Sequence, residues 1–395
     1  MTKKLPHYRF QGYTDAWKLR KLGEVAKYRN GKAHEQSIVA EGDYVVINSK
    51  FVSTGGVVEK FSSRQLEPLY KNEIAFVLSD IPNGKALSKT FLVDVDQKYT
   101  LNQRIAAITP KESASFLNEL LNRNSYFLKF DNGVGQTNLA KDQVLEFNAF
   151  FPTLPEQKAI GTFFSDLDQL ITLHQRKLDT LKEQKKTYLK LLFPAKGQTK
   201  PALRFQGFED DWEEVKLGEV CTIQGGNAWK SDSYSLTGEY LVVTIANVTG
   251  EYFIADKKGN RIDINPNEMQ YVLKKGDILI SLTGNVGRVS KMTESKGVLN
   301  QRVGKLTTTA NFEFIFSILR TEKFENEMRL VSQGAAQANI SNKDVLQYMI
   351  SLPSLPEQEA IGIFFQTFDQ EITQVEDKLA SLKEMKKTLL RKLFV

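Results

Sequence analysis

The chain has 395 residues, a length typical of two or three domains. Hydrophobic residues make up 41% and charged residues 25%, which excludes a disordered or fibrous chain, and the net charge of +6 permits a polyanionic partner without requiring one. Cys221 is the single cysteine, so an internal disulfide is excluded. We expect a cytoplasmic protein, because the sequence has no apolar signal segment and no apolar run of membrane-spanning length.

Several short segments recur in order along the chain, which indicates two copies of one unit. The segment RFQG at 9–12 returns at 204–207, LGEV at 22–25 returns at 217–220, and LNQR at 101–104 returns at 299–302. In the same way, GVGQTNL at 133–139 corresponds to GAAQANI at 334–340. A period of about 200 residues is too long for a solenoid, so we interpret the repeat as an internal duplication.

Each copy begins with a part of mixed composition, residues 1–153 in the first copy and 202–354 in the second. Short β-type runs bounded by turn residues lie at 45–47, 74–78 and 90–93, and again at 240–245 and 276–281. Periodic apolar residues predict helices over 113–127 and 312–331. We therefore predict an α+β fold with a twisted sheet for each part, and two target recognition domains once the resemblance described below is taken into account.

A long helix is predicted after each part, over 154–193 and 355–395, with a polar linker at 194–201 between the copies. Each helix begins with LPEQ, where Glu156 or Glu357 suits the positive end of the helix dipole. Apolar positions then alternate four and three residues apart over more than four heptads, which is a coiled-coil pattern. The predicted interface residues are Ile160, Phe164, Leu167, Ile171, Leu178, Leu181, Ile361, Phe365, Phe368, Ile372, Leu379 and Leu382.

Two amphipathic helices in separate cores are the alternative, but a period of 3.6 residues would drift away from this seam over its length. His174 occupies a seam position where the second copy has Val375. It is either a partly exposed packing residue or a polar residue that marks the register.

The order of the segments also predicts how the helices pair. The first helix leaves the first globular part and leads into the second, and the ends of a compact domain usually lie close together. The second helix should therefore run back antiparallel to the first, giving a pseudo-two-fold arrangement with a globular part at each end of a coiled-coil rod. A seam of this length spans roughly 50 Å, which exceeds the turn of B-DNA, about 34–36 Å.

These features together resemble the specificity subunit of type I restriction–modification systems, over the whole chain. The motifs that carry the resemblance are the paired LPEQxAIGxFF helices, the RFQG, Trp and LGEV segments, GDILISLTGNVGRV at 276–289 and the GQxN-type segments. In the first copy, residues 72–80 read NEIAFVLSD instead of GDILISLTG, so the roles of this loop transfer poorly between copies and the two half-sites should differ.

The resemblance implies a non-catalytic subunit in which two target recognition domains read a split site in the major groove of double-stranded DNA. It also implies that the helices fix the spacer and bind two modification subunits, which methylate adenine with S-adenosylmethionine. Restriction subunits, which use ATP and Mg²⁺, would join the complex. No cofactor or metal is expected in this chain, since no Walker loop, methyltransferase signature or zinc-ligand cluster occurs in the sequence.

The residues that read the DNA should lie in the divergent stretches, where Arg, Lys, Asn and Gln can reach base edges or phosphates. The candidates are Lys50, Arg64, Lys85, Lys89, Lys230, Lys258, Arg261, Asn285 and Arg288. For each of them, a solvated surface position is favoured over a contact with DNA. Trp229 fits a packing anchor better than a base contact. A shared role in loop structure is favoured for the recurring residues Gln136, Asn138, Gln337 and Asn339.

Two other functions are compatible with the sequence. A coiled-coil adaptor that bridges proteins would show the same helices, and salt-dependent DNA binding by the complex would distinguish the two. A stand-alone DNA enzyme would need a catalytic constellation that we do not find in the sequence.

Overall fold

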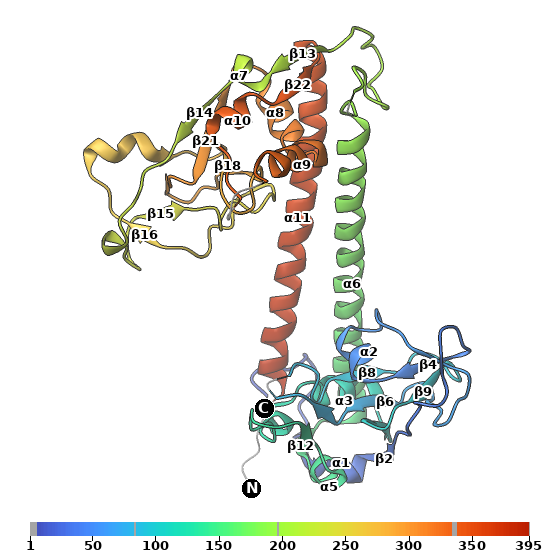
Figure 1. Cartoon of the computed structure of the whole chain (residues 1–395). Helices are drawn as coiled ribbons and strands as arrows, with labels where there is room; N and C mark the ends of the chain where they lie inside the picture. The colour runs from blue at the N-terminus through green and yellow to red at the C-terminus, as the bar shows by residue number, and fades with distance from the viewer. Residues whose placement is uncertain (1–5, 83, 196, 334–337, 395) are drawn as a thin grey trace. The chain divides into compact units, whose positions relative to one another are not determined.

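The computed structural model describes residues 6–82, 84–195, 197–333 and 338–394 (Figure 1). It contains two long helices, α6 (Leu154–Leu191) and α11 (Leu355–Leu393). We call the part before α6 head 1 and the part between α6 and α11 head 2. The chain forms two compact units, and unit 2 runs from Arg176 to Asp377 while unit 1 takes the residues on either side. Each unit therefore combines one head with part of both long helices.

Two four-stranded sheets form most of head 1. The first is antiparallel, in the order β2 (Ala26–Asn30), β10 (Ile105–Pro110), β6 (Ile74–Val77) and β8 (Thr90–Leu92). The second has the order β3 (Ile38–Val39), β5 (Phe61–Ser62), β4 (Tyr44–Ile47) and β9 (Tyr99–Leu101), with β4 and β9 parallel. Two strand pairs join β1 (Lys18–Lys21) to β12 (Asn148–Phe151) and β7 (Ser79–Asp80) to β11 (Thr137–Asn138). The short helices are α1 (Leu22–Val25), α2 (Ser49–Ser53), α3 (Ala114–Leu121), α4 (Ser125–Leu128) and α5 (Lys141–Leu145).

Head 2 repeats this plan. Its antiparallel sheet has the order β14 (Cys221–Gly225), β21 (Val303–Thr308), β18 (Ile278–Ser281) and β19 (Val289–Lys291). Its second sheet has the order β16 (Arg261–Ile262), β15 (Tyr240–Val243), β20 (Gly297–Leu299) and β17 (Val272–Leu273), with β15 and β20 parallel. β13 (Glu213–Lys216) pairs with β22 (Met349–Leu352). The helices are α7 (Leu217–Val220), α8 (Phe312–Ile318), α9 (Glu322–Val331) and α10 (Asn342–Leu346), with 3₁₀ turns at Ser231–Ser233 and Pro266–Tyr271.

The α+β fold class is confirmed, with two corrections. Each head has two four-stranded sheets where one was predicted. The helices predicted over 113–127 and 312–331 are each broken in two. In head 1 the break follows from Arg123, whose φ of 53° is incompatible with a right-handed helix, after which Asn124 caps α4. In head 2, Thr321 caps α9 by accepting the Phe324 amide.

The antiparallel sheet of head 1 is buried on both faces, because successive side chains of its strands point alternately into two different cores. Ile74 and Phe76 face a core shared with α3, α6 and the last part of α11. Ala75 and Val77 face a second core shared with β4 and β9. In unit 2, Phe365 of α11 packs into the main core of head 2. The long helices are therefore part of the core of their unit.

The predicted antiparallel pairing of the long helices is confirmed, and it can be followed within each unit. In unit 1, Phe164 packs on Phe394 with ring centroids 6.4 Å apart, and Asp168 binds Lys386 at 2.7 Å. Moving forward along α6 thus means moving backward along α11. In unit 2, Lys182 binds Glu376 at 2.7 Å and the Phe193 ring lies 5.9 Å from that of Phe365.

Most of the predicted seam positions are buried. Among the twelve residues proposed for the interface, Ile171 and Phe368 are partly buried and the other ten are buried. His174 is also partly buried, and its Nδ1 atom lies 2.8 Å from the carbonyl oxygen of Leu170. No helix in the described part of the chain is long and apolar enough to cross a membrane.

Candidate nucleic-acid interface

In head 2, the loop between β18 and β19 carries two of the predicted contact residues. Asn285 is exposed on this loop and Arg288 is half-buried at its end. The Gly284 amide donates to the Ala338 carbonyl at 2.8 Å, and the Gly287 amide donates to the Ser281 carbonyl at 2.9 Å. The loop is therefore held at both ends, while its polar tip faces solvent.

A glycine is required at the second of these anchors. Gly287 has a φ of +81°, and a Cβ atom built there would lie 2.9 Å from the Cβ of Met328 in α9. The asparagine of the GQxN-type segment also supports the loop, since the Thr283 hydroxyl donates to the Asn339 side chain at 3.0 Å. This contact agrees with the loop role favoured for Asn339. Gln337 lies outside the described residues.

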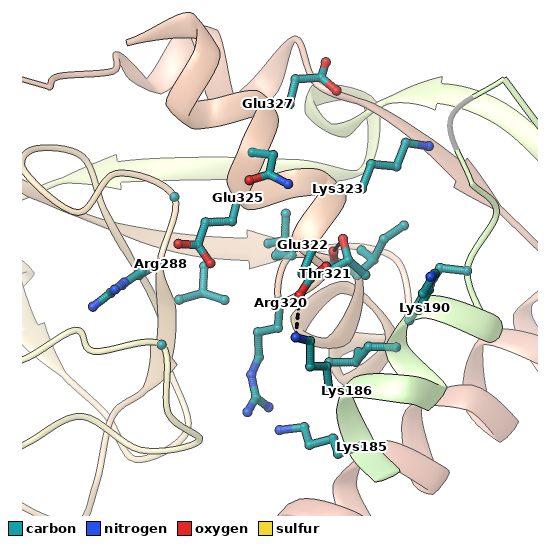
Figure 2. Close-up of a pocket in the computed structure, with 18 of the residues that line it drawn as sticks. Lys185, Lys186, Lys190, Arg288, Arg320, Thr321, Glu322, Lys323, Glu325 and Glu327 are labelled. Carbon is teal, nitrogen blue, oxygen red and sulfur yellow. Dashed lines mark hydrogen bonds and ion pairs between the residues drawn. The ribbon is translucent and has the colours of Figure 1, made fainter. Parts of the chain in front are cut away.

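Arg288 also lines a cleft of about 1420 Å³ within unit 2. Figure 2 shows Lys186 and Lys190 of α6 on one wall and Glu322, Glu325 and Glu327 of α9 on another. The Lys186 ammonium binds the Glu322 carboxylate at 3.1 Å. Arg288 has no ion pair within the described residues, so its guanidinium can meet an outside ligand.

The other three candidates of head 2 lie apart from this loop. Lys230 precedes the 3₁₀ turn at Ser231–Ser233 and Lys258 lies in the loop before β16, and both are exposed. The Arg261 guanidinium donates to the backbone carbonyls of Gly238, at 2.6 Å, and Glu239, at 2.5 Å. Arg261 is therefore occupied in holding its own loop. Trp229 is buried and donates to the Leu299 carbonyl at 3.0 Å, which agrees with a packing anchor.

In head 1, the loop after β7 is organised by Asp80, whose carboxylate accepts the amides of Ala86, at 2.6 Å, and Leu87, at 3.1 Å. Lys85 is exposed on this loop. Lys89 follows it and donates to the Ser53 carbonyl of α2 at 3.1 Å. This hydrogen bond connects the loop that carries Lys85 to α2, the helix that carries Lys50.

That helix, α2, presents Lys50 as an exposed residue, whereas Arg64 is exposed beyond β5 in the second sheet. Gln136 donates to the Ser79 hydroxyl at 2.6 Å, and Asn138 pairs with Ser79 in the β7–β11 ladder. Both contacts fit the loop role favoured for Gln136 and Asn138.

An ion pair at the start of each long helix was not predicted, although its residues lie in the repeated RFQG and LPEQ segments. Arg9 donates to both oxygens of Glu156 at 2.7 Å, and Arg204 donates to both oxygens of Glu357 at 2.7 Å. The repetition of an arginine and a glutamate at matching positions was the signal that could have revealed these pairs.

Each unit also contains an ion cluster centred on a lysine of a long helix, half-buried in unit 1 and buried in unit 2. In unit 1, Lys386 binds Asp168 at 2.7 Å and Glu119 at 3.0 Å. Burial opposes the charge, but Glu119 and Asp168 together raise the pKa of Lys386. In unit 2, Lys185 binds Asp369, which Arg320 also binds at 2.7 Å.

The charge balance of these two clusters is opposite. Burial and the neighbouring Arg320 lower the pKa of Lys185 to about 8, because two cations share one carboxylate. In unit 1, one cation serves two carboxylates. Among the described residues, no group of three or more His, Cys, Asp or Glu side chains is placed to hold a metal ion.

The sequence matches the model of a known protein family. The model of a family described as the type I restriction modification DNA specificity domain matches residues 14–183 and 209–384, one match in each half of the chain. The chain belongs to this type I specificity family. The specificity subunit of the type I restriction enzyme MjaVIII from Methanocaldococcus jannaschii is 26% identical over 398 residues, covering 95% of this chain and 91% of the relative. The putative MjaX specificity subunit of the same organism is 28% identical over 65% of this chain and 60% of its own length.

A solved structure supports the same fold. The crystal structure of the type I restriction–modification S subunit from M. genitalium aligns with a TM-score of 0.70 at 18% identity, over 99% of both chains. Both relatives from M. jannaschii are named specificity subunits. As a member of the type I specificity family, the chain is the DNA-recognition component of a type I restriction–modification system and not a catalytic one, as the resemblance implied.

Proposed function

We propose that the chain recognises a split DNA site, with head 1 reading one half and head 2 the other through the major groove. The observation that carries this proposal is the β18–β19 loop, which presents an exposed Asn285 and an arginine without an ion pair in the described structure on a backbone fixed at both ends. Asparagine and arginine are suited to bidentate contacts with adenine and guanine. A fixed backbone lowers the entropy lost when such contacts form.

The second part of the proposal concerns partners. Membership of the type I specificity family supports a role as the scaffold for two modification subunits and for restriction subunits. S-adenosylmethionine, ATP and Mg²⁺ would be bound by those partners. The paired helices would set the length of the unread spacer between the half-sites. The different sequences of the β18–β19 loop and of the β6–β7 region support two different half-sites.

The test is to reconstitute the chain with its modification subunits and to map methylated adenines on random DNA. We expect two short half-sites at a fixed separation. Replacing Asn285 with Ala should relax one position of one half-site, with a loss of discrimination of about 1–3 kcal/mol if the contact is bidentate. The exposed Asn267 provides a matched control, since N267A changes the same residue type elsewhere in head 2. One undivided methylated motif would refute the proposal.

A further inference from the structure

The repeated LNQR motif is only partly explained by the fold. It lies at 101–104 and 299–302, where it joins the second sheet of each head to the antiparallel sheet. Leu101 and Leu299 end their strands and are fully buried, so the first residue of the motif belongs to the core. The other three residues, 102–104 and 300–302, form what we call the LNQR turn.

Both LNQR turns are built by the same hydrogen bonds. In head 1 the Ile105 amide donates to the Asn102 carbonyl at 3.0 Å, and the Asn102 side chain accepts the Arg104 amide at 3.4 Å. The turn of head 2 repeats these contacts at 2.9 Å and 3.3 Å. The asparagine is therefore part of the structure of the turn. Glutamine and arginine occupy its two central positions, which most residue types can fill.

A close approach of the backbone fixes each turn in place. The residue that follows β2 or β14 is a glycine, Gly31 in head 1 and Gly226 in head 2. A Cβ atom built on Gly31 would lie 2.0 Å from the Asn102 carbonyl oxygen, and one built on Gly226 would lie 2.3 Å from that of Asn300. No side chain fits at either glycine unless the turn moves. The central residues of the turn are therefore presented on a fixed backbone.

The LNQR turn of head 2 contacts both of the segments that carry candidate DNA contacts. The Leu282 amide donates to the Arg302 carbonyl at 3.0 Å, and Leu282 is the first residue of the β18–β19 loop. The Asn300 amide donates at 3.3 Å to the carbonyl of Val243, which ends β15. That strand leads into the loop with Lys258. Arg302 therefore lies where the two segments meet.

Head 1 has the same arrangement around its own loops. The Leu78 amide donates to the Arg104 carbonyl at 3.0 Å, and Leu78 leads into β7 and the loop with Lys85. The Asn102 amide donates at 3.1 Å to the carbonyl of Ile47, which ends β4 and leads into α2. The loops differ in sequence between the heads, but the arginine has the same place beside them.

The two arginine side chains are unused by the protein itself. Arg104 and Arg302 are exposed, and within the described residues their guanidinium groups make no hydrogen bond or ion pair. The guanidinium of Arg29, in β2, is by contrast held by Glu67 and Glu73. Each LNQR turn thus offers a cation with five free donors next to the segments that we propose contact DNA.

Recurrence in both copies would not by itself indicate a function. Lys71 and Lys275 are also exposed cations at matching positions, three residues before β6 and β18. They lie at the end of these strands that is opposite to the candidate loops. The place of Arg104 and Arg302 beside those loops is what distinguishes them, and the two lysines provide a control for the charge.

The ligand follows from the identity of the arginine in two heads that we propose read different half-sites. Base edges carry the sequence of a half-site, whereas backbone phosphates are the same in every duplex. A guanidinium can hold a phosphate through two parallel hydrogen bonds. We propose that Arg104 and Arg302 each bind a backbone phosphate beside the half-site of their own head, which sets the register of the neighbouring loops on the bases. This inference rests on the proposed function.

The experiment uses the full chain in complex with its modification subunits and a duplex carrying the methylated motif. R104Q and R302Q are compared with K71Q and K275Q, which remove the same charge from the same heads. Losing one phosphate contact lowers the slope of log affinity against log salt by about 0.9. Between about 50 and 200 mM salt, the wild type should thus lose roughly 3.5-fold more affinity than R104Q or R302Q. We expect wild-type slopes for K71Q and K275Q.

Two further readouts test the assignment to phosphate. The methylated motif should stay unchanged in R104Q and R302Q, because a phosphate contact carries no sequence information. R104K and R302K should recover the wild-type slope, since lysine binds phosphate as a point charge.

Wild-type slopes for R104Q and R302Q, or an equal reduction in the lysine controls, would overturn the inference and leave the proposed function standing. A relaxed position in the methylated motif would also overturn it and would assign the arginine to base reading. Failure of the wild-type complex to prefer the motif over random DNA would instead refute the proposed function.

Discussion

Lys386 and Lys185 lie 201 residues apart at matching positions of the two long helices, yet they should respond oppositely to the same substitution. Replacing each with Met removes the charge and keeps a side chain of similar length. In K386M, Asp168 and Glu119 lose their shared cation. In K185M, Asp369 keeps its ion pair with Arg320 at 2.7 Å. We expect K386M to destabilise unit 1 strongly and K185M to leave unit 2 within about 1 kcal/mol of the wild type.

The size of the K386M effect follows from Glu119, whose side chain is 5% exposed. Losing one partner of a buried ion pair costs about 3–5 kcal/mol. Glu119 can reduce this cost by taking up a proton, and protonating a carboxyl with a pKa of 4.5 at pH 7 costs about 3.4 kcal/mol, at 1.36 kcal/mol per pH unit. Asp168 is half-exposed and contributes little. The loss should therefore be about 3 kcal/mol at pH 7.

The pH dependence gives a second readout for K386M. Burial already raises the pKa of Glu119, and removing Lys386 takes away the charge that opposes this rise. A carboxyl whose folded pKa lies above its unfolded value stabilises the fold at low pH and loses that contribution as the pH rises. The K386M deficit should thus be smaller at pH 5 than at pH 7.

Urea denaturation followed by circular dichroism measures the total loss in the free energy of unfolding. Hydrogen exchange then assigns this loss to unit 1 or unit 2. Equal losses for K386M and K185M, or a K386M deficit that does not change between pH 5 and pH 7, would refute the reasoning from charge balance.

Four further outcomes follow from the structure. The indole of Trp212 donates to Glu357 at 3.2 Å, whereas that of Trp17 has no partner within the described residues, so W212F should cost about 1 kcal/mol more than W17F in urea titrations. Replacing Leu178 or Leu379 with Asp buries a charge in the helix pair and should cost several kcal/mol, seen as a lower melting temperature; an unchanged melting temperature would place these leucines outside the interface. Because the folded pKa of about 8 for Lys185 lies below 10.5, the unfolded chain binds more protons between these values, so wild-type stability should rise with pH there while K185M lacks this rise. A fragment of residues 1–200 should pair with itself through its seam and recognise a symmetric site; a folded monomer in sedimentation would contradict this.

The sequence was most informative where one physical constraint acts over many residues. The seam from Ile160 to Leu192 repeats the same requirement for burial every three or four positions, so its helices and their pairing could be predicted. The duplication reinforced this, because each landmark could be checked against a second copy. The number of sheets was harder to predict, since strands of two or three residues, such as Phe61–Ser62, carry almost no periodic signal.

The candidate interface shows the same contrast. Asn285 and Arg288 were chosen as candidates because Asn and Arg in a divergent stretch can reach base edges, and the structure places both on the loop between β18 and β19. The role of Arg261 was missed, because its two carbonyl partners become neighbours only when β15 and β16 pair. The sequence likewise could not reveal that Arg320 shares Asp369 with Lys185, since these residues come from three separate elements.

The interleaving of the two units has a consequence for how the protein is made. The core of head 1 includes Leu382 and Leu393, which are synthesised more than two hundred residues after most of that core. We therefore expect the core of head 1 to close only after α11 has been synthesised, whereas domains generally fold as units with the N-terminal one first. Such long-range closure slows folding and gives chaperones a defined interval in which to act.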